Sequence, residues 1–120
     1  MVAAEGRDGF TASVIADNVF NFMLGALDTT EKWLGNIVLR LLGDPEWQER
    51  LRARPELIEP FNEEVMRHDT VAQVIQRKVA PGGAEVARAS MQGGDTVYLM
   101  LGAANRDPAE FADPDRFDPG

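Results

Sequence analysis

The chain has 120 residues, and none of them is cysteine. Disulfide bonds and thiolate metal sites within these residues are therefore excluded. Basic residues are also few, because 12 Lys and Arg stand against 20 Asp and Glu, which gives a net charge of −8. A nucleic-acid surface or an anionic membrane surface would need a basic footprint. We therefore expect neither nucleic acid nor a membrane among the partners.

A run of apolar residues long enough to span a membrane is missing as well. The most apolar stretch, residues 13–27, is too short for a bilayer and contains Asp17, Asn18 and Asn21. With no cysteine either, a cytoplasmic location is the expectation. The hydrophobic content of 44% is that of a globular protein, and the length is that of one ordinary domain.

Apolar residues in the first third of the chain recur at helical spacing. Steps of three and four residues lead from Val14 to Leu42, which predicts one helix between an N-cap at Thr11 and a C-cap at Gly43. About 30 residues of helix span on the order of 45 Å. A compact domain of this size is only about 35 Å across. The chain is therefore either half of an extended assembly or a piece of something larger.

Two further helices, short strands and an irregular end are expected after this helix. The helices cover residues 44–54 and 55–69, and the second has a buried stripe formed by Leu57, Ile58, Phe61, Val65 and Met66. An alternating pattern predicts a strand at 71–80, a turn at 81–83 and a second strand within 93–101. Asp107 and Pro108 begin a short helical turn, and an irregular loop closes the chain at 112–120. The fold class is mainly α with a small β region (α+β).

One conflict lies inside the predicted long helix, where Gly25, Ala26, Asp28 and Thr29 interrupt its apolar pattern. Glycine costs roughly 1 kcal/mol there relative to alanine. The simpler interpretation is a close helix–helix contact made possible by small side chains. The alternative is a helix opened so that a flat ligand lies against its backbone, with the carboxylate and hydroxyl relaying protons.

Charged residues later in the chain also have two interpretations. Glu64 and Arg67 lie three residues apart on a helix, where an exposed ion pair is the usual outcome. Arg77 shares the apolar face of the first predicted strand with Ile75 and Val79. A cation on that face either binds an anionic ligand group or reaches water along its flexible stem.

Five blocks of the sequence, in this order, resemble the cytochrome P450 family, and in particular its soluble bacterial haem-thiolate monooxygenases. The pair formed by GAANRDP and PDRFDP is highly specific, whereas E-x-x-R alone is a weak signal. The blocks are LGALDTT (24–30), EEVMRHD (63–69), AQVIQR (72–77), GDTVYLMLGAANRDPAEF (94–111) and FADPDRFDPG (111–120).

The resemblance implies a partial P450 fold in which the long helix crosses the distal face of a haem. Thr29 would hydrogen-bond the oxygen bound there, and Asp28 would help to deliver protons. Gly25 and Ala26 would leave room for the macrocycle, and Arg77 would pair with a haem propionate.

Other roles follow from the same motif matches. Glu64 and Arg67 match the family's E-x-x-R, which pairs with an arginine of the PDRF segment, here Arg116. This buried triad is a structural lock and not a catalytic group. The residues expected to border the substrate are Asn21, Leu24, Ala72 and Val74.

The resemblance also implies a function for a larger protein. Residues 1–120 would form one partial domain, the central portion of a haem monooxygenase that inserts one atom of dioxygen into a small apolar organic substrate with electrons from a ferredoxin-type donor. The family's axial cysteine is absent from these residues, so no metal ligand is expected here and the chain alone is expected to be inactive. The alternative is a truncated, non-catalytic relative that acts as a structural or interaction module.

Overall fold

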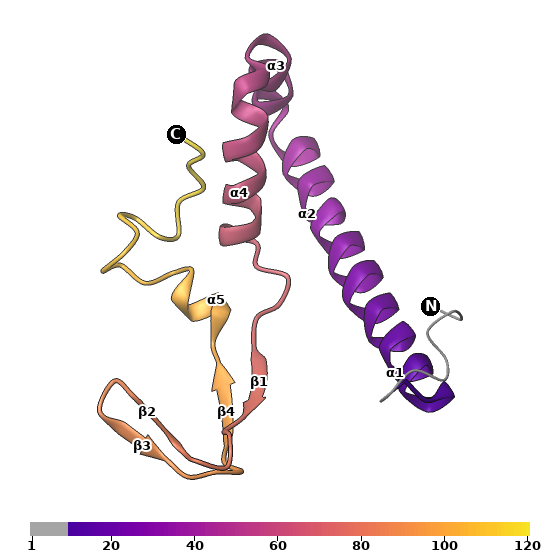
Figure 1. Ribbon diagram of the computed structural model, residues 1–120. Helices are drawn as coiled ribbons and strands as arrows, with labels where there is room; N and C mark the ends of the chain where they lie inside the picture. The colour runs from indigo at the N-terminus through magenta and orange to yellow at the C-terminus, as the bar shows by residue number, and fades with distance from the viewer. Residues whose placement is uncertain (1–9) are drawn as a thin grey trace.

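One long helix makes up the N-terminal part of the described structure (Figure 1). The computed structural model describes residues 10–120, so residues 1–9 of the expected single domain lie outside the described residues. The helix consists of α1 (Ala12–Met23), the π-helical segment η2 (Leu24–Asp28) and α2 (Thr29–Gly43). The predicted N-cap is confirmed, because the Thr11 hydroxyl accepts a hydrogen bond from the backbone N–H of Val14 at 3.2 Å.

The end of this helix lies one residue later than predicted. Gly43 is still helical, and Asp44 is the C-cap, with φ −138° and ψ 90°. The physical reason is Pro45, which disfavours helical backbone in the residue before it. Asp44 also begins the next helix, α3 (Pro45–Ala53), by accepting a hydrogen bond from the N–H of Glu46 at 3.1 Å.

The core lies where α2, α3 and α4 meet. After a 3₁₀ turn, η3 (Pro55–Leu57), helix α4 (Ile58–His68) packs against α2. Phe61 and Val65 are 1% and 0% exposed. The rings of Trp47 and Phe117 complete an aromatic cluster around Phe61, with centroids 5.4–6.0 Å apart. The predicted stripe is therefore correct at its centre and wrong at Ile58 and Met66, each 48% exposed, because α4 is covered on one side only.

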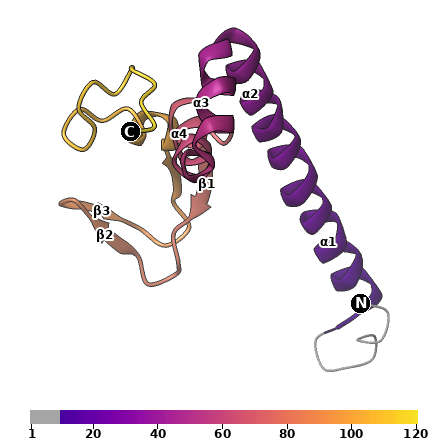
Figure 2. The same ribbon diagram turned by 90° about the horizontal axis from the view of Figure 1, so that it is seen from above.

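Two small antiparallel sheets follow α4. The strands β1 (Ile75–Lys78) and β4 (Thr96–Leu99) pair with Arg77 opposite Val97. The predicted turn at 81–83 is present, since the N–H of Gly83 donates to the carbonyl of Ala80 at 2.9 Å. Beyond it, β2 (Ala84–Val86) and β3 (Ala89–Met91) form a hairpin that projects away from the helices (Figures 1 and 2).

The structure differs from the sequence-based expectation in these strands and in the segment after them. The first strand is shorter than predicted, and the β2–β3 hairpin was missed. The residues at its tip, Ala87 and Arg88, have φ 48° and 71°. Positive φ is uncommon for both residue types, so the sequence did not indicate a turn there. Residues Leu101–Ala104 form a short helix, α5, that was also missed. The predicted helical turn after Asp107 is present, because the N–H of Phe111 donates to the Asp107 carbonyl at 2.9 Å and the Asp107 carboxylate accepts the N–H of Ala109 at 2.9 Å.

The molecule is open and elongated. Its radius of gyration is 19.7 Å, whereas a compact chain of this length would have about 14 Å. Figures 1 and 2 show the long helix extending well beyond the other elements. None of the described helices is long and apolar enough to cross a membrane. The large apolar side chains that remain exposed on the long helix include Phe20, Phe22, Leu24, Leu27, Leu34, Val38, Leu39 and Leu42.

Candidate functional site

The π-helical segment Leu24–Asp28 is the irregular part of the long helix. Its residues widen one turn, so that the regular hydrogen-bond pattern is interrupted. The Thr29 hydroxyl donates to the carbonyl of Gly25 at 2.5 Å. A Cβ atom at Gly25 would meet no other atom within 4 Å, so within residues 10–120 no neighbouring helix packs on it. The described structure therefore does not use Gly25 for a helix–helix contact.

The carboxylate of Asp28 forms an ion pair on the same helix. Its Oδ2 atom lies 2.7 Å from Nζ of Lys32, and the two side chains are 52% and 59% exposed. An exposed pair at this spacing contributes little to stability. The Asp28 carboxylate can therefore readily exchange Lys32 for water.

A cavity of about 1040 Å³ lies between α2, α4 and the C-terminal loop. Of the expected site residues, Thr29, Ala72, Glu64 and Arg67 line it. Asn21, Leu24, Gly25, Ala26, Asp28, Val74, Arg77 and Arg116 do not. The complete lining is Thr29, Thr30, Trp33, Glu59, Pro60, Glu63, Glu64, Met66, Arg67, Thr70, Val71, Ala72, Leu101, Asn105, Phe111, Asp118 and Pro119.

Arg77 lies outside this cavity on the exposed strand β1. Its Nη1 atom donates to the carbonyl of the preceding residue, Gln76, at 2.8 Å. Among the described residues, no group of three or more His, Cys, Asp or Glu side chains is arranged to hold a metal ion.

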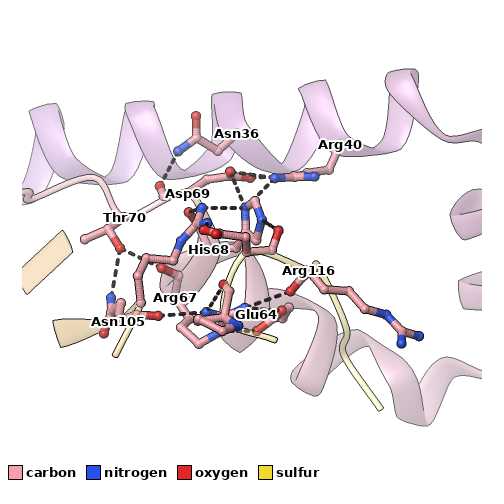
Figure 3. A network of polar contacts seen from close by, with 12 residues as sticks. Asn36, Arg40, Glu64, Arg67, His68, Asp69, Thr70, Asn105 and Arg116 are labelled. Atoms are coloured by element: carbon pink, nitrogen blue, oxygen red, sulfur yellow. Dashed lines mark hydrogen bonds and ion pairs between the residues drawn. The ribbon is translucent and has the colours of Figure 1, made fainter. Parts of the chain in front are cut away.

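Glu64 and Arg67 form a two-point ion pair at the centre of Figure 3. Arg67 Nε lies 2.6 Å from Glu64 Oε2, and Arg67 Nη2 lies 2.7 Å from Oε1. The remaining donors of Arg67 reach the carbonyls of Asn105, Pro114 and Arg116 at 2.7, 2.9 and 3.0 Å. Glu64 also accepts the N–H of Asp118 at 2.7 Å. The pair therefore fastens the loop 105–118 to α4.

The guanidinium of Arg116 does not join this pair, in contrast to the arrangement that the resemblance implies. Arg116 contributes its backbone carbonyl, while its side chain is 69% exposed and lies 3.3 Å from Asp118. The physical reason is that the Glu64 carboxylate is already occupied at both oxygens by Arg67 and the Asp118 N–H.

The electrostatics of the pair favour its charged form. Burial raises the pKa of the Glu64 carboxyl, but the hydrogen bonds from Arg67 and the Asp118 N–H together bring this pKa below its ordinary value. The hydrogen bond to Glu64 raises the pKa of Arg67. Both groups are therefore ionised near neutral pH.

A second polar cluster, also drawn in Figure 3, connects α2 to the end of α4. Arg40 binds both carboxylate oxygens of Asp69, at 2.6 and 2.7 Å, and Asn36 donates to the Asp69 carbonyl at 2.8 Å. The hydrogen bond from Arg40 lowers the pKa of Asp69, although burial opposes this shift. The same bond raises the pKa of Arg40.

His68 links this second cluster to the C-terminal loop. Its Nδ1 atom lies 2.6 Å from Nη2 of Arg40 and 3.2 Å from Nη2 of Arg106. The same Nδ1 atom lies 2.9 Å from Oδ1 of Asp69. On the other side of the ring, Nε2–H donates to the Asp115 carbonyl at 2.9 Å, because a carbonyl oxygen only accepts. Arg106 in turn pairs with the Asp115 carboxylate at 2.5 Å. This cluster was not predicted from the sequence; within it, the Arg106–Asp115 pair joins the adjacent motifs GAANRDP and PDRFDP.

Comparisons with known proteins agree with this geometry. The family model for cytochrome P450 matches residues 1–120. The biotin biosynthesis cytochrome P450 of Bacillus subtilis is 37% identical over 112 residues, which cover 93% of this chain and 28% of that protein. Putative cytochrome P450 140 of Mycobacterium tuberculosis is 43% identical over 96 residues, covering 80% and 22%.

The fold is also that of solved P450 structures. Cytochrome P450 CREJ superposes with a TM-score of 0.80 at 29% identity, over 98% of this chain and 30% of that one. The chain thus spans between 22% and 30% of the length of these relatives. The partial P450 fold expected from the sequence is confirmed, and the chain belongs to the cytochrome P450 family.

Proposed function

We propose that residues 1–120 form the central part of a haem-thiolate monooxygenase, which inserts one atom of dioxygen into a small apolar organic substrate. The observation that carries this proposal is the opened helical turn at Leu24–Asp28, with Thr29 hydrogen-bonded across it to Gly25. A widened turn beside an unobstructed glycine leaves backbone and hydroxyl accessible to a ligand, and such π-helical turns occur frequently at functional sites.

The residues present fit one face of a haem. Gly25 leaves open space above the helix, and the neighbouring Leu24 and Leu27 are exposed apolar side chains, as a flat apolar group requires. Arg77 is the cation proposed for a propionate, and the thiolate ligand has no candidate in a chain without cysteine. When bound, the haem supplies the redox chemistry that activates dioxygen.

Thr29 is the residue that we propose to position a proton. Its hydroxyl hydrogen points to the Gly25 carbonyl, so the lone pairs of Oγ1 stay available to accept a hydrogen bond from a protonated oxygen atom in the site. Asp28, one residue earlier, can exchange Lys32 for water and so replenish that proton.

The substrate and the electron donor complete the proposal. Ala72 lines the large cavity, and Leu24 and Val74 are exposed apolar side chains. With Asn21, they form the proposed border of an apolar substrate. A ferredoxin-type protein would supply the electrons, and the whole enzyme would work in the cytoplasm.

The experiment compares Thr29→Ala with Thr30→Ala in the complete haem protein that contains this chain. Thr30 is the matched control because it is the adjacent threonine and lines the same cavity. We expect both variants to bind haem normally, and only Thr29→Ala to form less product and more peroxide per reductant consumed. Equal coupling of reductant to product in the two variants would refute the role of Thr29.

A further inference from the structure

His68 is the only histidine in the chain, and it lies where α2, the end of α4 and the C-terminal loop meet (Figure 3). Its side chain is 13% exposed, so protons from solvent can reach the ring. Histidine is the side chain whose charge commonly changes between pH 5 and 8. His68 is therefore the group of this cluster that can respond to pH near neutrality.

The Nδ1 atom of His68 faces groups that require opposite protonation states. Guanidinium nitrogens only donate, so the contacts of 2.6 Å to Arg40 and 3.2 Å to Arg106 require an unprotonated Nδ1. A carboxylate only accepts, so the contact of 2.9 Å to Asp69 Oδ1 requires Nδ1–H. Because Nε2–H donates to the Asp115 carbonyl in either state, the choice is between a neutral ring and a positively charged one.

The charges around the ring are balanced only while the ring is neutral. The charged groups that surround it are Arg40 of α2, Glu64, Arg67 and Asp69 at the end of α4, and Arg106 and Asp115 of the C-terminal loop. Each of these guanidiniums is paired with one of the carboxylates. A proton on Nδ1 would therefore leave one positive charge in excess, directly beside two guanidiniums that it repels.

Arg106 is held less firmly beside the ring than Arg40. Arg40 binds both carboxylate oxygens of Asp69, so it keeps its position without His68. Within residues 10–120, the side chain of Arg106 hydrogen-bonds to α4 only at His68, through Nδ1 and, at 2.8 Å, through the backbone carbonyl. Its other partner, Asp115, belongs to the same loop. Repulsion from a protonated ring would therefore act on the contact that joins Arg106 to α4.

We propose that protonation of His68 releases the turn 106–111 from α4. With a neutral ring, Arg106 is held by Nδ1 and by the His68 carbonyl. With a protonated ring, Nδ1–H binds Asp69, and Arg106 is repelled from the ring. The bonds from Arg67 to the carbonyls on both sides of the turn do not involve the ring, so the rest of the loop stays in place.

The test measures hydrogen exchange of individual backbone amides in the complete haem protein that contains this chain, at about pH 5.5 and about pH 7.5, toward the two ends of the histidine range. The variant is His68→Gln, whose side-chain amide can accept and donate a hydrogen bond but takes up no proton. The reporters are the N–H groups of residues 106, 107, 110 and 111, which donate to carbonyls of α5 and of Asp107. Comparing the two proteins at the same pH removes the intrinsic pH dependence of exchange.

The N–H of Asp118 is the internal control. It donates to Glu64 at 2.7 Å and does not contact the ring. The hydrogen bonds from Arg67 and from this N–H help to bring the pKa of Glu64 below its ordinary value, so the Glu64 carboxylate stays ionised at the lower pH of the test. The Asp118 amide should therefore exchange equally in the two proteins at both pH values.

We expect the reporter amides to exchange equally in the two proteins at the higher pH. At the lower pH they should exchange up to about tenfold faster in the unaltered protein, because release takes up one proton and such an equilibrium changes by at most about tenfold over one pH unit. Equal exchange at the lower pH would overturn the proposal. Slower exchange in the unaltered protein would also overturn it, because the proton would then strengthen the contact through Asp69.

A second variant keeps the test decisive if His68→Gln does not fold. Arg106→Gln removes the repelled cation and keeps the histidine, so the exchange of its reporter amides relative to the Asp118 amide should be the same at both pH values. A pH-dependent ratio in this variant would refute the role of Arg106. The release involves neither haem nor oxygen chemistry and none of these results bears on Thr29, so this proposal and the proposed function fail separately.

Discussion

Replacing Arg67 with alanine should destabilise this protein severely, because five donor contacts are lost and the buried Glu64 carboxylate loses its charged partner. Glu64 is 8% exposed, and without Arg67 its carboxylate would keep only the N–H of Asp118. Breaking a buried ion pair by removing one partner costs about 3–5 kcal/mol. A whole domain has a stability of about 5–15 kcal/mol. The loss would therefore be a large share of the total free energy of unfolding.

The measurement is the free energy of unfolding from urea titration followed by far-UV circular dichroism, together with the yield of folded protein. Arg52→Ala is the matched control, because Arg52 is an exposed arginine that donates a long hydrogen bond of 3.4 Å to Gln48. That control should change stability by less than about 0.5 kcal/mol. Arg67→Lys should be intermediate, since a single ammonium cannot reproduce the two-point contact with the carboxylate.

A double-mutant cycle distinguishes the buried pair from an exposed one. Glu64→Gln combined with Arg67→Met should cost at least about 1 kcal/mol less than the sum of the single losses, because each single variant leaves an unpaired polar group. Additive losses, or an Arg67→Ala protein as stable as the control, would refute the reasoning. The pair would then contribute no more than an ordinary exposed helix pair.

Three further predictions concern other parts of the chain. The hydrogen bond from Arg40 lowers the pKa of Asp69, so it stabilises the fold fully above the ordinary Asp pKa of about 3.9, and this stabilisation is lost as pH falls through the lower pKa of the folded state. Arg40→Met should therefore make the free energy of unfolding, measured by urea titration at several pH values, less dependent on acid. Ala87→Asn combined with Arg88→Gly should raise the free energy of unfolding by about 1 kcal/mol and so raise the urea midpoint, because both positions have positive φ. An unchanged midpoint would show that the hairpin tip is not strained. The isolated chain, reduced and exposed to carbon monoxide with added haem, should lack the red-shifted Soret band of thiolate-ligated haem, since a chain without cysteine cannot supply a thiolate.

The helices could be predicted from the sequence because their signals are local. The three- and four-residue spacing of apolar side chains and the caps at Thr11 and Asp44 act within one or two turns. The hydrogen bonds of these two caps are present in the structure. The exposure of Ile58 and Met66 could not be predicted in this way, because periodicity reports which face is apolar and not whether another element covers it.

The parts that were missed depend on contacts distant in sequence. The cluster of Arg40, His68 and Arg106 joins residues 28 to 38 positions apart, and no short window contains it. Arg116 was placed in the buried network because its family motif suggests a side-chain partner. The structure instead uses its carbonyl, which every residue type has and which no sequence pattern reveals.

The positions of the two polar networks have a consequence for the proposed reactive segment. The core, the Glu64–Arg67 pair and the Arg40–Asp69 pair all lie on the C-terminal side of Thr29, whereas neither α1 nor η2 contains a buried residue. Trp33, which packs against the core, lies four residues after Thr29, about 6 Å along the helix axis. Thr29 is therefore held by α2, while Gly25 and the residues before it depend on whatever covers their exposed apolar faces. The hydrogen bond from Thr29 to Gly25 crosses this boundary, so covering the N-terminal part of the helix would also fix the geometry of the proposed proton-positioning site.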